Sequence, residues 1–133
     1  MKTIDTLALI DDDETYQFIA KHTIMNLNIV DRLKIFSNGK EAIDYLRSKL
    51  HDPSQLPDVI LLDLNMPVMD GWDFLERYLM LEPRIGKKIH IYIVTSSVDP
   101  VDVERANRIN AVTDYFVKPL TRDKLVSILE SIV

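Results

Sequence analysis

The chain has no cysteine and no long apolar stretch. Without cysteine it can have no disulfide, no thiol nucleophile and no metal site built on sulfur. No apolar run approaches the roughly 20 residues that a membrane-spanning helix needs. Acidic residues closely follow the short apolar stretch at the N-terminus, so we expect no signal peptide and a cytoplasmic location.

The chain also has fewer basic than acidic residues. The formal net charge is -5 over 133 residues, with 16 Lys and Arg against 21 Asp and Glu. Proteins that bind nucleic acid or an anionic membrane surface carry a basic patch, so we expect neither partner. Hydrophobic residues make up 47% and charged residues 28%, which is typical of a soluble globular protein, and the length indicates one domain.

The chain contains a fivefold alternation of strand and helix patterns. Strands are predicted at about residues 6–10, 33–36, 59–62, 89–94 and 113–117. The first and third are continuous apolar runs, as expected for central parallel strands. The second alternates with Arg32 and Lys34 and therefore suits an edge strand. Such repeats predict a parallel sheet with helices on both faces and right-handed crossovers.

Helix signals follow each predicted strand. In the first helix, Tyr16 and Ile19 belong to an apolar stripe at helical spacing. Asp99 and Pro100 suit the N-cap and first residue of the fourth helix, and Asn110 is expected to end it in a left-handed conformation. The fourth helix has few apolar residues, so we expect it to be the least firmly packed and the readiest to shift.

Polar side chains follow four of the predicted strands. Asp11 and Asp12 follow the first strand, Asp63 the third, Thr95 the fourth and Lys118 the fifth. Ligands of open parallel sheets bind outside the carboxyl ends of the strands, where the strand order changes direction. We therefore expect these five side chains to form one site.

This set of side chains could hold a divalent cation and a phosphoryl group. Three carboxylates brought together repel one another unless a cation or shared protons offset their charge. Oxygen ligands without nearby His or Cys favour Mg²⁺ or Mn²⁺ over zinc. An Asp beside such a cation can attack phosphorus, with a lysine charge and a hydroxyl donor on the transferred group. For residues 11–14 alone, a solvated acidic loop at a helix N-terminus explains the acids equally well.

Four segments carry motifs in a fixed order. They read Ile-Asp-Asp-Asp at 10–13, Asp-Leu-Asn-Met-Pro-Val-Met-Asp-Gly at 63–71, Val-Thr-Ser at 94–96 and Tyr-Phe-Val-Lys-Pro at 115–119. Together they resemble the receiver domain of two-component response regulators, in particular the CheY-like, stand-alone type. The resemblance implies one receiver domain over residues 1–133 with no output domain. It also implies a flavodoxin-like (βα)5 fold, a doubly wound parallel five-stranded sheet with strand order 2-1-3-4-5.

The resemblance implies a role for each acidic residue. Asp63 would accept a phosphoryl group from a sensor histidine kinase or a phosphotransfer protein in a Mg²⁺-dependent reaction. Asp12 and Asp63 would bind Mg²⁺ (or Mn²⁺) through their carboxylates and Asn65 through its backbone carbonyl. Asp11 would act through a metal-bound water.

The resemblance also implies how the signal leaves the site. Lys118 would contact the phosphoryl oxygens, and its bond to Pro119 would be cis. Thr95 and Tyr115 match the switch pair of the family, in which the hydroxyl moves toward the phosphoryl group and the ring turns inward. The surface of the fourth helix, fifth strand and fifth helix would then contact a downstream protein, and it could also form a homodimer.

Asn65 and Ser97 stand at the two positions that tune self-dephosphorylation in the family. Neither is an acid or a strong base, so the sequence offers no obvious aid to in-line attack by water. We expect a signalling domain with slow self-dephosphorylation and no other catalysis. Three alternatives stay open. They are a haloacid-dehalogenase-type phosphatase, which wants a second Asp two residues after the nucleophile, a flavodoxin-like electron carrier, and a docking module that never uses its phosphate site.

Overall fold

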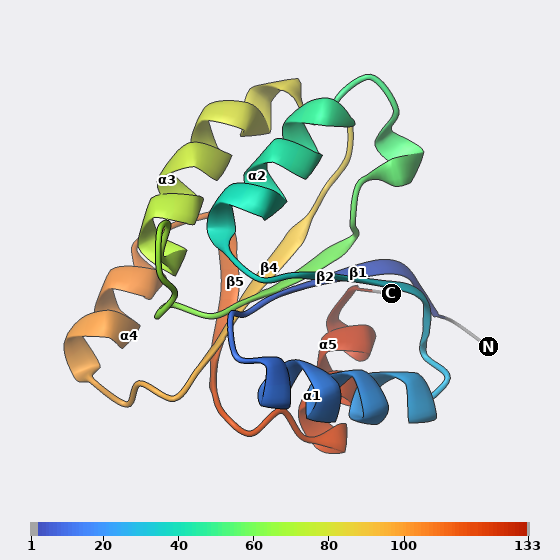
Figure 1. The fold of residues 1–133 in the computed structure, drawn as a ribbon, viewed down its shortest axis with the longest axis vertical. Helices are drawn as coiled ribbons and strands as arrows, with labels where there is room; N and C mark the ends of the chain where they lie inside the picture. Colours follow the sequence, from blue (N-terminus) through green and yellow to red (C-terminus); the bar gives the residue numbers. More distant parts are fainter. Residues whose placement is uncertain (1–2, 133) are drawn as a thin grey trace.

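The computed structural model describes residues 3–132, which alternate strands and helices five times (Figure 1). The strands are β1 (Ile4–Ile10), β2 (Val30–Phe36), β3 (Val59–Leu62), β4 (His90–Thr95) and β5 (Val112–Val117). The helices are α1 (Glu14–Asn26), α2 (Gly39–Ser48), α3 (Gly71–Leu81), α4 (Pro100–Asn107) and α5 (Arg122–Ile132). Two short 3-10 helices, η1 (Pro53–Gln55) and η2 (Glu82–Arg84), lie in the loops before β3 and β4.

All five strands are parallel and form one sheet in the order β2-β1-β3-β4-β5. In this register Leu9 of β1 lies between Ile35 of β2 and Leu61 of β3. The flavodoxin-like fold and its strand order are therefore confirmed. The order changes direction between β1 and β3, which is where such folds bind their ligands.

β2 forms one edge of the sheet, as its alternating pattern predicts. The strand begins at Val30, three residues before the predicted start at residue 33. Val30 pairs with Ile4, and Arg32 pairs with Thr6. The side chain of Arg32 is nevertheless exposed. The first residues of β2 were not predicted as strand because polar, solvent-facing side chains there interrupt the apolar pattern.

Helices cover both faces of the sheet. Figure 1 shows α1 and α5 on one face, and α2, α3 and α4 on the other. Each face has its own core cluster. The cluster under α1 and α5 includes Leu7, Leu9, Ile24, Leu125 and Ile128. The cluster under α2, α3 and α4 includes Ile10, Ile60, Leu62, Phe74 and Tyr78.

α1 buries a narrower stripe than its sequence predicts. Ala20 and Ile24 are buried and Tyr16 is half-buried, so the inner stripe follows four-residue steps. Ile19, predicted on the apolar stripe, is 55% exposed. A helix turns by about 100° per residue, and this rotation carries the neighbour of Ala20 out to solvent.

α4 is the least buried helix on its face. Asp99 caps it by accepting a hydrogen bond from the N–H of Val101 at 2.9 Å, and Pro100 is its first residue, as predicted. Of its eight residues only Ala106 is buried, and Val101 is 68% exposed. The expected thin apolar face of this helix is confirmed.

The predicted end of α4 at Asn110 is wrong. The helix ends at Asn107, and Asn110 does not have a positive φ. The N–H of Arg108 bonds to the carbonyl of Arg105 at 3.2 Å, and the N–H of Ile109 bonds to that of Ala106 at 3.1 Å. These tight i to i+3 bonds close the helix in a right-handed conformation, so no left-handed residue is needed.

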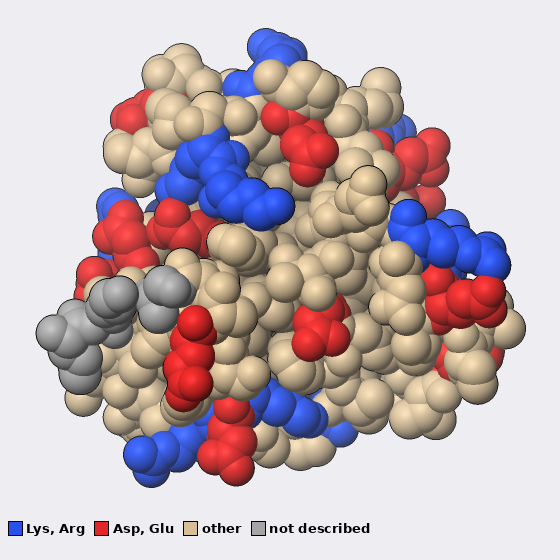
Figure 2. All heavy atoms as spheres, turned by 180° about the vertical axis from the view of Figure 1, so that it is seen from behind, with Lys and Arg blue, Asp and Glu red and all other residues tan. Residues whose placement is uncertain are grey.

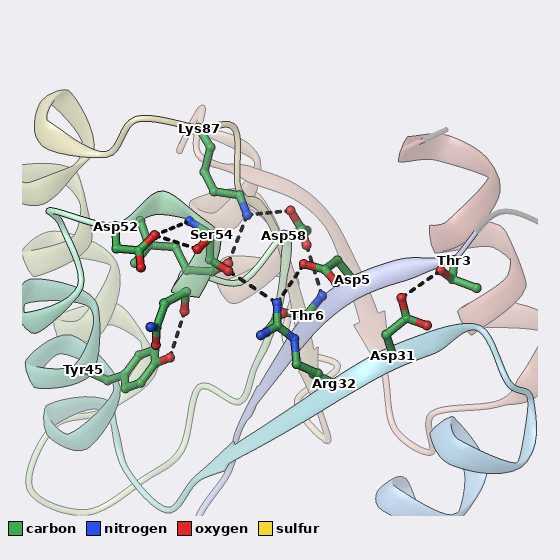
Figure 3. A network of polar contacts seen from close by, with 12 residues as sticks. Thr3, Asp5, Thr6, Asp31, Arg32, Tyr45, Asp52, Ser54, Asp58 and Lys87 are labelled. Atoms are coloured by element: carbon green, nitrogen blue, oxygen red, sulfur yellow. Dashed lines mark hydrogen bonds and ion pairs between the residues drawn. The ribbon is translucent and has the colours of Figure 1, made fainter.

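Polar contacts fix the loops at the amino edge of the sheet (Figure 3). Lys87 lies 2.7 Å from the Asp58 carboxylate and donates to the carbonyl of Leu56 at 3.0 Å. Asp58 in turn accepts from the N–H of Thr6 at 3.1 Å. These loops lie near the starts of β1, β3 and β4. Asp11, Asp63 and Lys118 follow the ends of their strands and therefore lie at the opposite edge of the sheet.

Charges of both signs are interspersed over the face of the molecule seen in Figure 2. That face shows no large patch of one sign, in keeping with the composition. Among residues 3–132, none of the helices has the length and apolarity to cross a membrane.

Candidate functional site at the carboxyl edge of the sheet

Three carboxylates meet where β1 and β3 end. The N–H of Asp63 donates to the carbonyl of Ile10 at 3.0 Å, which extends the pairing of the two strands by one residue. As a result, one oxygen each of Asp11, Asp12 and Asp63 lies within 4.8 Å of the others. Asp11 and Asp63 are 1% and 6% exposed, whereas Asp12 is exposed. The predicted cluster is therefore assembled at the predicted edge.

The start of α1 holds the Asp11 side chain in place. Asp11 Oδ1 accepts a hydrogen bond from the N–H of Asp13 at 2.9 Å, and the Gln17 amide donates to the Asp11 carbonyl. Asp13 caps α1, accepting from the N–H groups of Thr15 and Tyr16. The cap thus couples the position of α1 to the position of the buried acid.

α3 begins in close contact with the segment that carries Asp63. The N–H of Gly71 donates to the carbonyl of Leu64 at 2.8 Å. A Cβ at Gly71 would lie 2.5 Å from the carbonyl oxygen of Asp63 and 2.7 Å from Leu64 Cα, both closer than atoms tolerate. The glycine at the end of the motif is therefore required by the backbone packing beneath Asp63.

Lys118 reaches the acids from the end of β5. Its Nζ lies 2.7 Å from Asp11 Oδ2 and 3.4 Å from Asp63 Oδ2. The bond between Lys118 and Pro119 is cis, as the resemblance implies. The Oδ1 atom of Asp63 is buried and has no hydrogen-bond partner among residues 3–132. One oxygen of the predicted phosphoacceptor is thus left unpaired.

Burial and neighbouring charges shift the pKa values of Asp11 and Lys118. Burial raises the pKa of Asp11, against the opposing hydrogen bonds from Lys118 and Asp13. Burial alone would lower the pKa of Lys118, but the hydrogen bond to Asp11 and the charges of Asp63 and Asp11 raise it above its ordinary value. Lys118 is therefore a cation at neutral pH.

The site offers a divalent cation an all-oxygen set of ligands. The three carboxylates lie close enough to share one ion, and hard oxygen ligands are those that Mg²⁺ prefers. A buried carboxylate oxygen without a partner costs free energy that a cation would recover. The acidic cluster therefore fits a magnesium-type site. Asn65, two residues after Asp63, is exposed, and ligation through its carbonyl stays a prediction.

A chain of polar contacts leads from the end of β4 to α4. Thr95 is fully buried, and its Oγ1 accepts from the N–H of Ser97 at 3.4 Å. The Tyr115 hydroxyl donates to the Ser97 carbonyl at 3.0 Å, and Ser97 Oγ donates to Asp102 of α4 at 2.7 Å. Burial raises the pKa of Tyr115, so this hydroxyl stays a proton donor. The expected switch residues therefore lie next to the helix expected to move.

Sequence reasoning missed the part that Tyr16 plays in the site. Tyr16 was expected only as part of an apolar stripe, yet its ring lies 4.0 Å from Lys118 Nζ. Burial, and then the charges of Asp11 and Asp63, raise its pKa far above the ordinary value. The only signal in the sequence is that Tyr16 lies one helical turn after the acidic run, which does not predict a lysine above its ring.

The model of the response regulator receiver domain family matches residues 7–130. The chain belongs to this family. Receiver domains are signalling domains, so this classification replaces the phosphatase and electron-carrier alternatives. It also accounts for the fold, the acidic cluster and the lysine after β5 at once.

The most similar proteins include short and long members of the family. The receiver is 31% identical over 127 residues to the chemotaxis protein CheY1 of Helicobacter pylori, covering 96% of this chain and 95% of CheY1. It is 30% identical over 126 residues to the probable methanogenesis regulatory protein FilR2 of Methanothrix harundinacea, covering 95% and 79% of the two chains. The DNA-binding transcriptional regulator NtrC of Escherichia coli is much longer, and the receiver spans 23% of it.

Solved structures give the same classification. A two-component response regulator from Cytophaga hutchinsonii matches with a TM-score of 0.89 and 28% identity, covering 98% of this chain and 97% of that one. The likeness extends over almost the whole chain, so the receiver fold accounts for every strand and helix described above.

Proposed function

We propose that this receiver accepts a phosphoryl group on Asp63 from a sensor histidine kinase or a phosphotransfer protein. One observation carries the proposal. Asp63 is almost fully buried, one of its oxygens has no partner within residues 3–132, and Lys118 lies 3.4 Å from the other. A carboxylate in this state is poorly solvated and close to a cation, which suits a nucleophile that waits for an electrophile.

The proposed transfer needs little from the protein beyond position and charge. A carboxylate oxygen of Asp63 attacks phosphorus, and the P–N bond of a phosphohistidine donor breaks with its electron pair remaining on the imidazole nitrogen. Lys118 then leaves Asp11 in part and stabilises the phosphoryl oxygens. Thr95 offers a hydroxyl donor from the adjacent strand end.

The proposed cofactor is Mg²⁺, or Mn²⁺ in its place. Asp12 and Asp63 would hold it through carboxylates, Asn65 through its carbonyl and Asp11 through a bound water. When bound, the ion would offset the negative charge that gathers on the phosphoryl oxygens. The close approach of the three carboxylates supports this assignment.

The proposed output is a change of the surface formed by α4, β5 and α5. Thr95 would turn toward the phosphoryl group, and Tyr115 would follow through its bond to the Ser97 carbonyl. Because α4 buries only Ala106, a small shift at Ser97 could move it. A downstream protein, or a second copy of the chain, would recognise the moved surface. A cytoplasmic location stays a prediction.

Slow self-dephosphorylation is part of the same proposal. The hydroxyl of Ser97 is engaged by Asp102, and Asn65 has no acidic or basic group. Neither residue can activate a water for attack on the aspartyl phosphate. The signal would therefore outlast the encounter with the kinase.

Calorimetric titration with Mg²⁺, followed by beryllofluoride as a phosphoryl mimic, tests the proposed site. We expect Asp63→Asn to weaken Mg²⁺ binding about tenfold or more and to abolish binding of the mimic. Asp13→Asn is the matched control, because it removes a charge from the same acidic run while an Asn still caps α1. Equal binding by the wild type and Asp63→Asn would refute the proposed site.

A further inference from the structure

Lys118 has a third neighbour besides the two carboxylates. Its Nζ lies 4.0 Å from the centre of the Tyr16 ring, a distance at which the face of an aromatic ring attracts a cation. The Lys118 side chain is only 18% exposed, so little water weakens this attraction. Asp11, Asp63 and the ring therefore hold the ammonium between them.

The start of α1 determines where the ring lies. Asp13 Oδ1 accepts from the N–H groups of Thr15 at 2.9 Å and Tyr16 at 3.2 Å, and the N–H of Asp13 donates to Asp11 Oδ1 at 2.9 Å. The ring also packs against the core cluster under α1 and α5. One short segment thus places both the carboxylate and the ring that contact Lys118.

The hydroxyl of Tyr16 does not explain why a tyrosine lies here. It is buried and has no hydrogen-bond partner among residues 3–132, a state that costs free energy. A leucine or methionine could fill much of the same space without that cost. What tyrosine offers, and an aliphatic side chain does not, is the electron-rich face turned to the Lys118 ammonium.

We propose that Tyr16 is a positioning residue for Lys118, acting through its ring face. The inference rests on the proposed function. Asp11 is both the nearest anion to Lys118 and one of the carboxylates that would share a cation. When a divalent cation takes up part of the Asp11 charge, the attraction between Asp11 and Lys118 weakens. The Tyr16 ring still attracts the ammonium and keeps Nζ near Asp63. A free lysine side chain would instead spread over many rotamers and reach the phosphoryl oxygens less often.

Aspartyl phosphate formation with acetyl phosphate and Mg²⁺ tests the proposal in a series of Tyr16 variants. We expect Tyr16→Phe, which keeps the ring, to react at the wild-type rate. Tyr16→Leu and Tyr16→Met should lower the second-order rate constant and the affinity for beryllofluoride by about fivefold. Two aliphatic variants are used so that a fold defect in one leaves the other informative.

Two further readouts separate positioning from a merely structural role. The affinity for Mg²⁺ alone should be unchanged in all Tyr16 variants, because the ring contacts the lysine and not the ion. In NMR spectra the Cε protons of Lys118 should show a ring-current shift in the wild type and Tyr16→Phe that disappears in Tyr16→Leu.

Tyr45→Leu is the matched control. The Tyr45 ring also faces two lysines, Lys34 and Lys49, at 5.4 and 5.9 Å. Its hydroxyl donates to the carbonyl of Gln55 in the loop before β3, at the amino edge of the sheet (Figure 3). This variant should phosphorylate at the wild-type rate.

The outcomes separate this inference from the proposed function. An unchanged rate in the aliphatic Tyr16 variants would overturn the inference, as would a Tyr16→Phe variant that is as slow as Tyr16→Leu. If the wild type forms no adduct and binds no beryllofluoride, the proposed function itself fails. The Lys118 ring-current shift can be measured whether or not the protein is phosphorylated. In a protein that is not phosphorylated, it would show the contact between Tyr16 and Lys118 without a role in phosphorylation, and the inference would fail with the proposed function.

Discussion

Gly71 shows how tightly a single residue can be constrained beneath the site. Its amide bonds to Leu64, and its Cα lies so close to the backbone of Asp63 and Leu64 that a Cβ would overlap both. These neighbours are backbone atoms, which cannot rotate away as a side chain can. The residue thus links the start of α3 to the position of the proposed phosphoacceptor, Asp63.

Gly71→Ala should lower the free energy of unfolding by about 1 to 3 kcal/mol, the usual cost of forcing atoms into a packed region. Urea denaturation followed by the fluorescence of Trp72 measures the change. Gly86→Ala is the control, because the Cβ there would meet the Pro53 side chain, at 3.1 Å, rather than backbone, and Gly86 lies in an exposed loop. A loss of stability at position 86 as large as that at position 71 would contradict the account.

Asp63, the proposed phosphoacceptor, is not fully hydrogen-bonded. Its Oδ1 is buried and has no partner in the described part of the chain, residues 3–132, while Lys118 is shared with the nearer Asp11. Lone buried polar atoms are uncommon in native structures and often mark a functional position. At the scale of single residues, the proposed phosphoacceptor therefore differs from Asp11 in having one buried oxygen without a hydrogen-bond partner among residues 3–132.

Among the elements, α4 buries little of its own apolar surface. Only Ala106 is buried, so polar interactions carry much of the attachment. Arg105 lies over the ring of Trp72 in α3, 4.3 Å from its centre, and Asp102 accepts from Ser97. These two contacts join α4 to the start of α3 and to the loop after β4, both of which adjoin the acidic site.

Arg105→Ala should loosen α4 selectively. We expect faster amide hydrogen exchange in residues 101–107, corresponding to about 1 kcal/mol less protection, with the central strands unchanged. Arg108→Ala is the control at the end of the same helix, since Arg108 pairs with the exposed Glu104 and such pairs contribute little. Equal exchange in the two variants would mean that the Arg105–Trp72 contact does not hold the helix.

The elements also show where sequence reasoning succeeds and where it stops. β1 and β3 were predicted because strands buried on both faces are uniformly apolar. Asn110 was expected to be left-handed, whereas Asn28 after α1 has that conformation with φ of 54°. The choice depends on which carbonyls the last turn leaves unpaired, and that is decided by tertiary packing rather than by residue type.

At the scale of the whole molecule, most of the site could be predicted because its residues follow strands of one parallel sheet. The fold brings every strand end to a single edge, so the positions of Asp11, Asp63 and Lys118 along the chain determine that they meet. Contacts that depend on side-chain direction could not be predicted in this way. Tyr16 is the clearest case, because helical periodicity turns it inward but does not reveal that Lys118 covers its ring.

The central claim is that the acidic edge of the sheet accepts a phosphoryl group on Asp63. The most direct test is the intact mass of the protein after incubation with acetyl phosphate, with and without Mg²⁺, in the wild type and Asp63→Asn. We predict one added phosphoryl group that requires Mg²⁺ and is absent from the variant. An adduct of equal yield on Asp63→Asn, or no adduct on a wild type that also fails to bind beryllofluoride, would contradict the claim.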